Sequence, residues 1–379
     1  MVSLLLIGGT GVLSSAVVAE ALRKAMDVTI VTRGTRKIPE GVHSIVCDKD
    51  NHEKLAQLIK PHYDAVIDFL CFSEEELARS FQFYSHYTDQ YFFMSSCAVY
   101  DSRTGVCEEN SPKVLPMWKY SVDKWAAEQK LALLAKSTNC NYTVIRPCVT
   151  YDDTRIPYGI SPRYGYHWTL CARILVGKPI ITWNKGANRG NMMRVEDFAV
   201  GVVGLIGNVR AYNEAFNICG DETPSNAEVL AIMEEYLHKK AIVIDMPTEF
   251  YAKQIPHRAG ELMGGRAIDA IISNDKIKSV VPQFAHSISI KEGVCKTLKA
   301  YTDKNYQSGI DWIFDAETDK TIRAWCRQNA IAAKTYKTGF VDYLGTATWE
   351  DRWKYYLTLY KNNALVRGAI RLKKMIQLR

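Results

Sequence analysis

The sequence contains no uninterrupted apolar run of about 18 residues, so it predicts no helix that crosses a membrane. Its ten cysteines include no Cys-x-x-Cys pair, which argues against a disulfide scaffold or a zinc site, and no metal is predicted. The first residues lack the basic segment and the cleavage site of a signal peptide. These absences together predict a cytoplasmic protein with reduced thiols.

Acidic residues are absent from one long stretch, 352–379, which contains eight lysines and arginines. The rest of the chain carries 40 basic and 41 acidic side chains, so the net charge of +7 comes from this tail. A nearly neutral body argues against a nucleic-acid partner. The tail also has aromatic and aliphatic residues, as in a basic amphipathic helix. The preferred interpretation packs it on the body with a solvated basic face; the alternative is contact with an anionic membrane.

The N-terminal residues have the pattern of a strand, a glycine turn and a helix. Leu4–Ile7 is a continuous apolar run, typical of a strand buried on both faces, and residues 16–22 are helical in pattern. Because glycines carry no Cβ, backbone N–H groups at the start of such a helix can approach a pyrophosphate. We therefore predict a bound dinucleotide, contacted here by Gly8, Thr10, Gly11, Val12 and Leu13.

The second strand, Val28–Thr32, ends where an acidic residue would bind the ribose 2′-hydroxyl of NAD. Arg33 stands there instead, and a guanidinium can pair with the 2′-phosphate of NADP. We therefore predict NADP in preference to NAD, although solvated loop charges at Arg33, Arg36 and Lys37 would give the same pattern. Further cofactor contacts are expected at Asp48, beside the adenine, and at Leu70, Pro147 and Val149.

Strands and helices alternate along the first 150 residues, which predicts a parallel sheet with right-handed crossovers. The fold class is therefore α/β: a doubly wound parallel Rossmann sheet, a smaller C-terminal substrate lobe and a helical C-terminal extension. We expect the dinucleotide-binding domain at 1–150 and the substrate lobe at 151–300, with a return to the first domain around 191–218. The extension, with its basic tail, is expected at 301–379.

Tyr120 and Lys124 are four residues apart in a predicted helix, so they lie on the same face. A phenol is a poor base near neutral pH, but a nearby ammonium favours the phenolate. The pair can then relay a proton to or from a substrate oxygen. Ser96, at the end of a strand, can hydrogen-bond the same oxygen. These three residues are the predicted catalytic group.

The order of these features resembles the extended short-chain dehydrogenase/reductase family, in particular its NAD-dependent epimerase/dehydratase group. The motifs that carry the resemblance are Ile7-Gly8-Gly9-Thr10-Gly11, Ser95-Ser96-Cys97-Ala98-Val99-Tyr100, Tyr120-Ser-Val-Asp-Lys124, Arg146-Pro147 and Val195-Glu-Asp197. The resemblance implies that Ser96, Tyr120 and Lys124 form a catalytic triad and that Lys124 also contacts the nicotinamide ribose. It further implies a homodimer.

Three departures narrow the activity that the resemblance implies. Cys97 and Ala98 stand where dehydratases of the family carry an acid/base pair, Gly190 stands where a phosphate-binding arginine is expected, and Ser14 replaces the last glycine. Epimerisation, or oxidation and reduction, of a sugar remains, with a nucleotide-sugar as the first choice. The alternatives are a reductase of a non-sugar carbonyl and a non-catalytic Rossmann protein that binds RNA or a partner.

The substrate is expected to contact Ser96, Cys97 and a polar, aromatic loop at 151–166. Arginine and tyrosine side chains there can hold a diphosphate and stack on a base or sugar. An exposed surface loop would have the same composition. The predicted substrate-binding residues outside the strand end are Arg155, Arg163, Tyr166 and Arg194.

Overall fold

The computed structural model describes residues 1–113, 116–303, 309–361 and 363, which form two compact units. The first unit comprises Met1–Asp152, Arg189–Pro224 and Met263–Gly293. The second comprises Asp153–Asn188, Ser225–Leu262 and the described residues from Val294 onward. Each unit therefore draws on segments that are far apart in the sequence.

A seven-stranded sheet with the order β10-β6-β5-β4-β1-β2-β3 forms the centre of the first unit, and all six pairs of neighbouring strands are parallel. This confirms the predicted doubly wound Rossmann sheet. The strands are β1 (Ser3–Ile7), β2 (Asp27–Thr32), β3 (His43–Val46), β4 (Ala65–Asp68), β5 (Gln90–Met94), β6 (Asn141–Pro147) and β10 (Glu214–Ile218). A short pair, β7 (Val149–Tyr151) and β9 (Met192–Arg194), lies outside this sheet.

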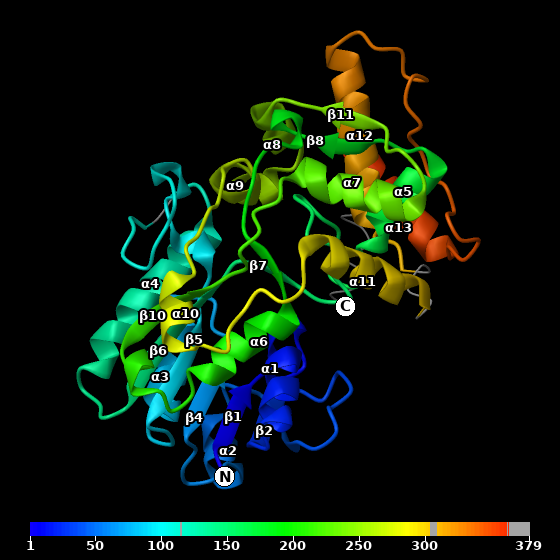
Figure 1. Cartoon of the computed structure of the whole chain (residues 1–379). Helices are drawn as coiled ribbons and strands as arrows, with labels where there is room; N and C mark the ends of the chain where they lie inside the picture. The colour runs from blue at the N-terminus through cyan, green and yellow to red at the C-terminus, as the bar shows by residue number, and fades with distance from the viewer. Residues whose placement is uncertain (114–115, 304–308, 362, 364–379) are drawn as a thin grey trace. The chain divides into compact units, whose positions relative to one another are not determined.

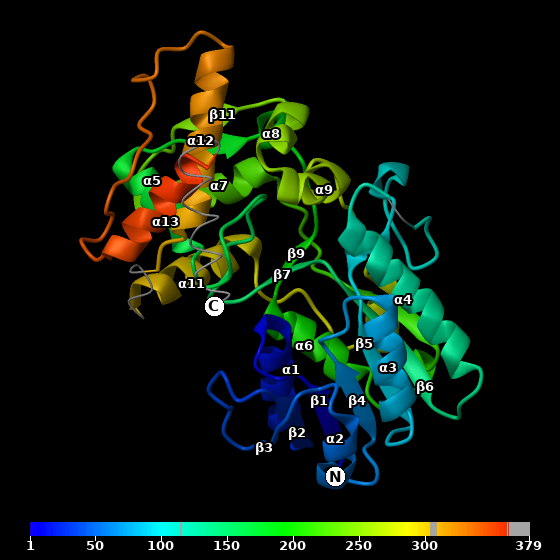
Figure 2. The same cartoon turned by 180° about the vertical axis from the view of Figure 1, so that it is seen from behind.

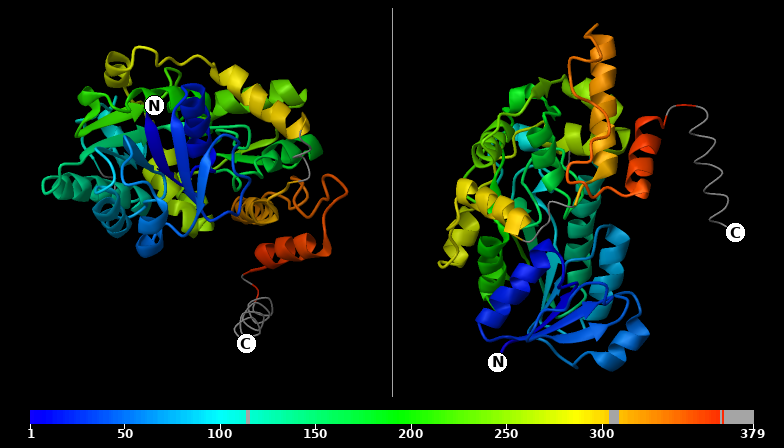
Figure 3. Two further views of the ribbon diagram at one scale, coloured as in Figure 1. Left: turned by 90° about the horizontal axis from the view of Figure 1, so that it is seen from below. Right: turned by 90° about the vertical axis from the view of Figure 1, so that its right-hand side faces the viewer.

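The residues of β1 alternate between two hydrophobic layers. Leu4 and Leu6 pack with α1 (Val12–Arg23) and α6 (Val195–Gly204), on the face seen in Figure 1. Leu5 and Ile7 pack on the other face with two long helices, α3 (Glu74–Tyr84) and α4 (Lys119–Ala135), seen in Figure 2. Figure 3 shows the helices on both sides of the blue strands. The remaining helices of this unit are α2 (His52–Leu58) and α10 (Asp275–Val280).

The strand order reverses between β1 and β4, and the crevice beyond the carboxyl ends of these strands is where open α/β sheets bind ligands. The glycine turn follows β1, the segment 69–72 follows β4, and Ser96 follows β5. The fold thus brings the predicted cofactor and catalytic segments to one edge of the sheet.

The second unit is mainly helical, with one parallel strand pair, β8 (Ile180–Thr182) and β11 (Val243–Asp245). Its helices are α5 (Trp168–Val176), α7 (Asn226–Leu237), α8 (Thr248–Gln254), α9 (Ala259–Glu261), most of α11 (Ile290–Asp303), α12 (Trp312–Gln328) and α13 (Trp349–Leu359). In the right-hand view of Figure 3, the red helix α13 lies beside the orange α12. The predicted tail helix thus begins three residues before Arg352, and positions 362 and 364–379 lie outside the described residues.

A charge network fills the interior of the second unit. Arg173, Lys178, Asp315 and Asp319 are all fully buried. Lys178 Nζ lies 2.7 Å from Asp315 Oδ2 and 2.5 Å from Asp319 Oδ2. Tyr355 of α13 donates its hydroxyl to Asp319 at 2.6 Å. The network is balanced in charge and ties α13 to α5 and α12.

Among the described helices, none has both the length and the apolar character needed to cross a membrane. The same residues contain no group of three or more side chains placed to hold a metal ion. All ten cysteines are within the described ranges, and each is a free thiol.

Candidate active site

The glycine turn has the backbone that a phosphate cradle needs. Gly8 and Gly9 have φ angles of +115° and +94°, which side-chain-bearing residues rarely adopt. A Cβ on Gly9 would also lie 2.7 Å from Ile30 Cγ2, whereas a Cβ on Gly11 would meet only the Ser14 hydroxyl. The first N–H groups of α1 have no acceptor within the helix, so they can bind an anion. The turn therefore fits the pyrophosphate of a dinucleotide.

Ser14 serves as part of the helix cap. It is buried, and its Oγ accepts a hydrogen bond of 2.9 Å from the Gly11 N–H. The sequence left open whether this hydroxyl is merely tolerated or contacts the pyrophosphate. This hydrogen bond gives the Ser14 hydroxyl a structural role, because it fixes the backbone of the glycine turn.

The basic residues after β2 lie next to the glycine turn. Arg33 is exposed at the end of the strand, and Arg36 Nη1 donates to the carbonyl oxygen of Thr10 at 2.8 Å. Sequence reasoning placed Arg36 in the loop but did not assign it a contact with the turn, because no spacing rule predicts such a loop closure. Asp48 is exposed and accepts the N–H of Asp50 at 2.9 Å.

Lys124 is a buried titratable group at the carboxyl edge of the sheet. Its Nζ donates to the carbonyl oxygens of Cys71, at 2.5 Å, and Met94, at 2.7 Å. Burial is the largest influence on it and lowers its pKa from the usual 10.5 to about 8. Its Nζ also lies 5.9 Å from the centre of the Tyr120 ring. The two residues predicted to act together are thus neighbours on α4, and the Lys124 ammonium lies where β4 and β5 end.

Asp68, at the end of β4, was not among the predicted site residues. Its Oδ1 accepts the N–H of Leu70 at 2.7 Å, and its Oδ2 accepts from Cys71 Sγ at 3.0 Å and from the Tyr91 hydroxyl at 3.1 Å. Ser80 donates to the same oxygen. This buried carboxylate fixes the turn that presents the Cys71 carbonyl to Lys124. An aspartate at a strand end was the available signal, but its partners come from other elements.

Ser96 and Tyr120 are connected through the first turn of α4. Ser96 is half-buried, and its Oγ accepts the Ala98 N–H at 3.2 Å. Ser121, next to Tyr120, donates its hydroxyl to the carbonyl of Ala98. Tyr120 is half-buried and packs on Trp118, with ring centres 5.2 Å apart. The start of α4 is therefore fixed against the segment that follows β5.

A buried ion pair supports this arrangement from within. Arg146 binds Glu128 through two hydrogen bonds, of 3.0 and 2.5 Å, and Glu128 accepts the Ser95 hydroxyl at 2.5 Å. Arg146 also donates to the Tyr100 hydroxyl at 2.6 Å. The pair ties α4 to β6 and to the strand end that carries Ser96.

Two predicted substrate contacts in the first unit have partners within the protein. Cys97 is buried, donates its thiol to the carbonyl of Arg146 at 3.1 Å, and has a pKa raised by burial. Arg194 is buried and binds Glu196 through contacts of 3.0 and 2.8 Å. Of the remaining cofactor candidates, Pro147 is buried at the end of β6, and Leu70 and Val149 are half-buried.

The other substrate candidates belong to the second unit. Arg163 donates to Asp311 Oδ2 at 3.1 Å and lies over the ring of Tyr166 at 4.7 Å. Arg155 lies over the ring of Tyr164 at 5.3 Å. The predicted loop thus does carry paired arginines and tyrosines, and their contact with a substrate stays a prediction.

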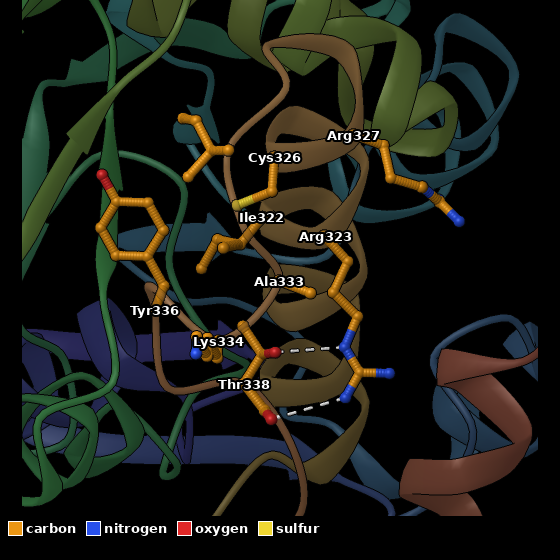
Figure 4. A pocket seen from close by; sticks show the side chains of 9 residues that line it. Ile322, Arg323, Cys326, Arg327, Ala333, Lys334, Tyr336 and Thr338 are labelled. Carbon is orange, nitrogen blue, oxygen red and sulfur yellow. Dashed lines mark hydrogen bonds between the residues drawn. The ribbon is translucent and has the colours of Figure 1, made fainter.

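A pocket of about 450 Å³ lies in the second unit beside α12 (Figure 4). None of the predicted site residues lines it. Arg323 closes one side by donating to the Thr338 hydroxyl at 3.1 Å. The lining residues are Ile322, Arg323, Cys326, Arg327, Ile331, Ala333, Lys334, Tyr336 and Thr338.

The parallel sheet with a glycine turn at its switch point is the architecture of a dinucleotide-binding Rossmann protein. Residues 4–219 match the model of the NAD dependent epimerase/dehydratase family, so the chain belongs to this family. The chain is also similar to 2′-dehydrokanamycin reductase of Streptomyces kanamyceticus. The two are 22% identical over 256 residues, which cover 66% of this chain and 71% of the reductase.

Solved structures of sugar-nucleotide epimerases share the fold. UDP-glucose 4-epimerase of Thermotoga maritima, solved with UDP-glucose, matches with a TM-score of 0.63 and 16% identity. UDP-glucuronic acid 4-epimerase of Bacillus cereus, solved with UDP-glucuronic acid and NAD, matches with a TM-score of 0.62 and 16% identity. Each match covers 80% of this chain and 99% of the other.

Proposed function

We propose that the chain is an NADP(H)-dependent oxidoreductase or epimerase that acts on a sugar, with a nucleotide-sugar as the preferred substrate. The observation that carries this proposal is the buried Lys124 beside Tyr120, at the sheet edge where the glycine turn lies. Perturbed lysines in such a position are typical of catalytic sites. The family and the ligands of the similar epimerase structures support a sugar substrate.

Tyr120 and Lys124 would have different roles in the transfer of a proton to and from the substrate. The Tyr120 oxygen takes the proton of a substrate hydroxyl during oxidation and returns it during reduction. The Lys124 ammonium stabilises the negative charge that develops on that oxygen. Ser96 orients the substrate oxygen by hydrogen bonding. A bound nicotinamide supplies the acceptor or donor of the hydride.

The residues after Ser96 favour simple redox chemistry or epimerisation over water elimination. The Cys97 thiol faces a backbone carbonyl and its pKa is raised, and Ala98 has no acidic group. Neither side chain can act as the acid or base that removal of a hydroxyl group requires. Dehydration by the route of the related dehydratases is therefore not proposed.

A carbonyl reductase is the second candidate. The similarity to 2′-dehydrokanamycin reductase favours it, because that match reaches beyond the family motifs to two thirds of the chain. The two candidates share the roles of Ser96, Tyr120 and Lys124. They differ in the substrate, which is a nucleotide-sugar for the first candidate and the carbonyl of a natural-product intermediate for the second.

The test is turnover of Tyr120→Phe on a panel of nucleoside-diphosphate sugars and their keto forms, with NADPH and NADP. We expect a loss of about 100- to 10,000-fold, because the proton relay is removed while the ring is kept. Tyr142→Phe is the matched control, since Tyr142 is a half-buried tyrosine near the opposite end of the sheet strands. Full turnover in Tyr120→Phe would show that the assigned proton relay is wrong.

A further inference from the structure

Helix α13 carries a row of exposed aromatic side chains. Trp349, Trp353, Tyr356 and Tyr360, the residue after the helix, are spaced by four, three and four residues, which places them on one face. Their exposed fractions are 76%, 43%, 41% and 48%. The opposite face packs into the second unit through Tyr355 and Leu359. We call the four exposed residues the aromatic stripe.

The rings of the stripe are already ordered against one another. Trp349 and Trp353 stack with centres 5.6 Å apart and an interplanar angle of 8°. Tyr356 and Tyr360 stack at 6.3 Å and 8°. A contiguous row of exposed aromatic rings on a surface is typical of an interaction site. Because the rings already stack pairwise, the stripe mainly offers their edges and outer faces.

Positive charge surrounds the end of the stripe. Arg352 lies on α13 and Lys361 follows the helix, whereas Lys354 pairs with Glu350 at 3.7 Å and with Asp351 at 3.5 Å in the first turn. Lys320 of α12 has a lowered pKa, first through burial and then through repulsion from Lys361. From position 352 to the C-terminus the sequence has eight basic residues and no acidic one. The surface that meets the stripe must therefore be both anionic and able to accept apolar rings.

A lipid bilayer surface meets both requirements. Tryptophan and tyrosine concentrate at the boundary between headgroups and acyl chains, where rings are buried and polar tips stay hydrated. Lysines and arginines beside them are attracted to anionic headgroups. A second copy of this chain would bring like charges together. Single-stranded RNA would stack its bases on open ring faces, and each ring of the stripe already uses one face in a pairwise stack.

We propose that the aromatic stripe of α13 docks the protein on an anionic lipid membrane. Docking is peripheral: the rings enter the headgroup region while Tyr355 and Leu359 keep the helix attached to the second unit. This surface is independent of the residues assigned to catalysis.

The experiment is co-sedimentation of the full chain with vesicles of phosphatidylcholine and phosphatidylglycerol, compared with phosphatidylcholine alone. We expect binding to the anionic vesicles that weakens with added salt, and a loss of about tenfold or more in Trp349→Ala/Trp353→Ala. Lys361→Glu should weaken binding as well. Val209→Ala, which changes a side chain that is 74% exposed in the first unit, is the control and should bind normally.

Several results would overturn the proposal. One is no binding to anionic vesicles at low salt, and another is equal binding by the double tryptophan variant when circular dichroism shows that it is folded. A gel shift with single-stranded RNA that is lost in the same variant would assign the stripe to RNA. Self-association of the native chain that this variant abolishes would assign it to a second copy.

Discussion

Lys124 in the first unit and Lys178 in the second are both buried lysines, but their partners differ. Lys178 is held by the carboxylates of Asp315 and Asp319, and the same network contains Arg173. Lys124 donates instead to two backbone carbonyl oxygens, those of Cys71 and Met94. One lysine is neutralised by full opposite charges, and the other is solvated by dipoles.

The difference predicts a structural role for Lys178 and a reactive role for Lys124. Removing one partner from a buried ion pair leaves an uncompensated charge, so such networks hold their elements in place. Burial lowers the pKa of both lysines. At Lys178 the carboxylates of Asp315 and Asp319 oppose this shift, whereas the Lys124 ammonium donates only to carbonyl dipoles and its pKa falls to about 8. The first kind of site stabilises the fold, and the second can take part in a proton relay.

The largest expected effect comes from breaking the network around Lys178. Asp319→Asn keeps the shape of the side chain but leaves Arg173 and Lys178 with one carboxylate between them. We expect the free energy of unfolding to fall by about 3 to 5 kcal/mol, measured by denaturant unfolding. Lys240→Ala breaks the pair between the exposed Lys240 ammonium and Glu234 and should cost less than about 1 kcal/mol. Similar losses in both variants would contradict the structural role of the network.

A smaller effect is expected from the titration of Lys124 in the protein without nucleotide. Its pKa is 10.5 in the unfolded chain and about 8 in the folded one, so between these values only the unfolded chain holds the proton. The free energy of unfolding should therefore increase by about 1 to 3 kcal/mol as the pH rises from about 8 to 10.5, and this gain is lost as the pH falls back to about 8.

Lys124→Met supplies the reference for that measurement, because methionine does not titrate. The difference in unfolding free energy between the native protein and Lys124→Met should grow with pH across the window. Parallel pH profiles for the two proteins would mean that Lys124 keeps its usual pKa in the folded state.

The smallest effect compares the buried hydroxyl of Ser14 with the exposed one of Ser15. Ser14→Ala removes the acceptor of the Gly11 N–H and should lower the free energy of unfolding by about 1 kcal/mol, seen in thermal or denaturant unfolding. Ser15→Ala should change it by less than about 0.5 kcal/mol. NADPH affinity should stay within a few fold in both. A large loss of affinity in Ser14→Ala alone would instead make the hydroxyl a ligand of the pyrophosphate.

The sheet could be predicted because its strands are buried on both faces and leave continuous apolar runs in the sequence. The predicted strands Leu4–Ile7 and Val28–Thr32 each lie within one residue of β1 and β2, at Ser3–Ile7 and Asp27–Thr32. The grouping of the catalytic candidates at one edge followed from the parallel topology. The triad of Ser96, Tyr120 and Lys124 required the family resemblance as well, because Tyr-x-x-x-Lys alone is common on exposed helices.

Side-chain contacts between residues that are far apart in the sequence could not be predicted. Asp68 binds Ser80 and Tyr91, and Arg173 binds Asp319, a partner 146 positions away. Isolated charged residues at such separations show no periodicity that would predict which of them form pairs. The tail was assigned by its charge, which begins at Arg352, whereas helix α13 begins at Trp349 because Thr348 caps it. The first tryptophan of the stripe was therefore missed.

The most direct test of the proposed NADP(H) site is a calorimetric titration of the native protein with NADPH and with NADH. We expect that both bind and that NADPH binds about tenfold or more tightly than NADH, because Arg33 can pair with its 2′-phosphate. Arg33→Ala should reduce that preference. Binding of NADH at least as tight as NADPH would contradict the assignment of Arg33, and no binding of either nucleotide would contradict the cofactor site itself.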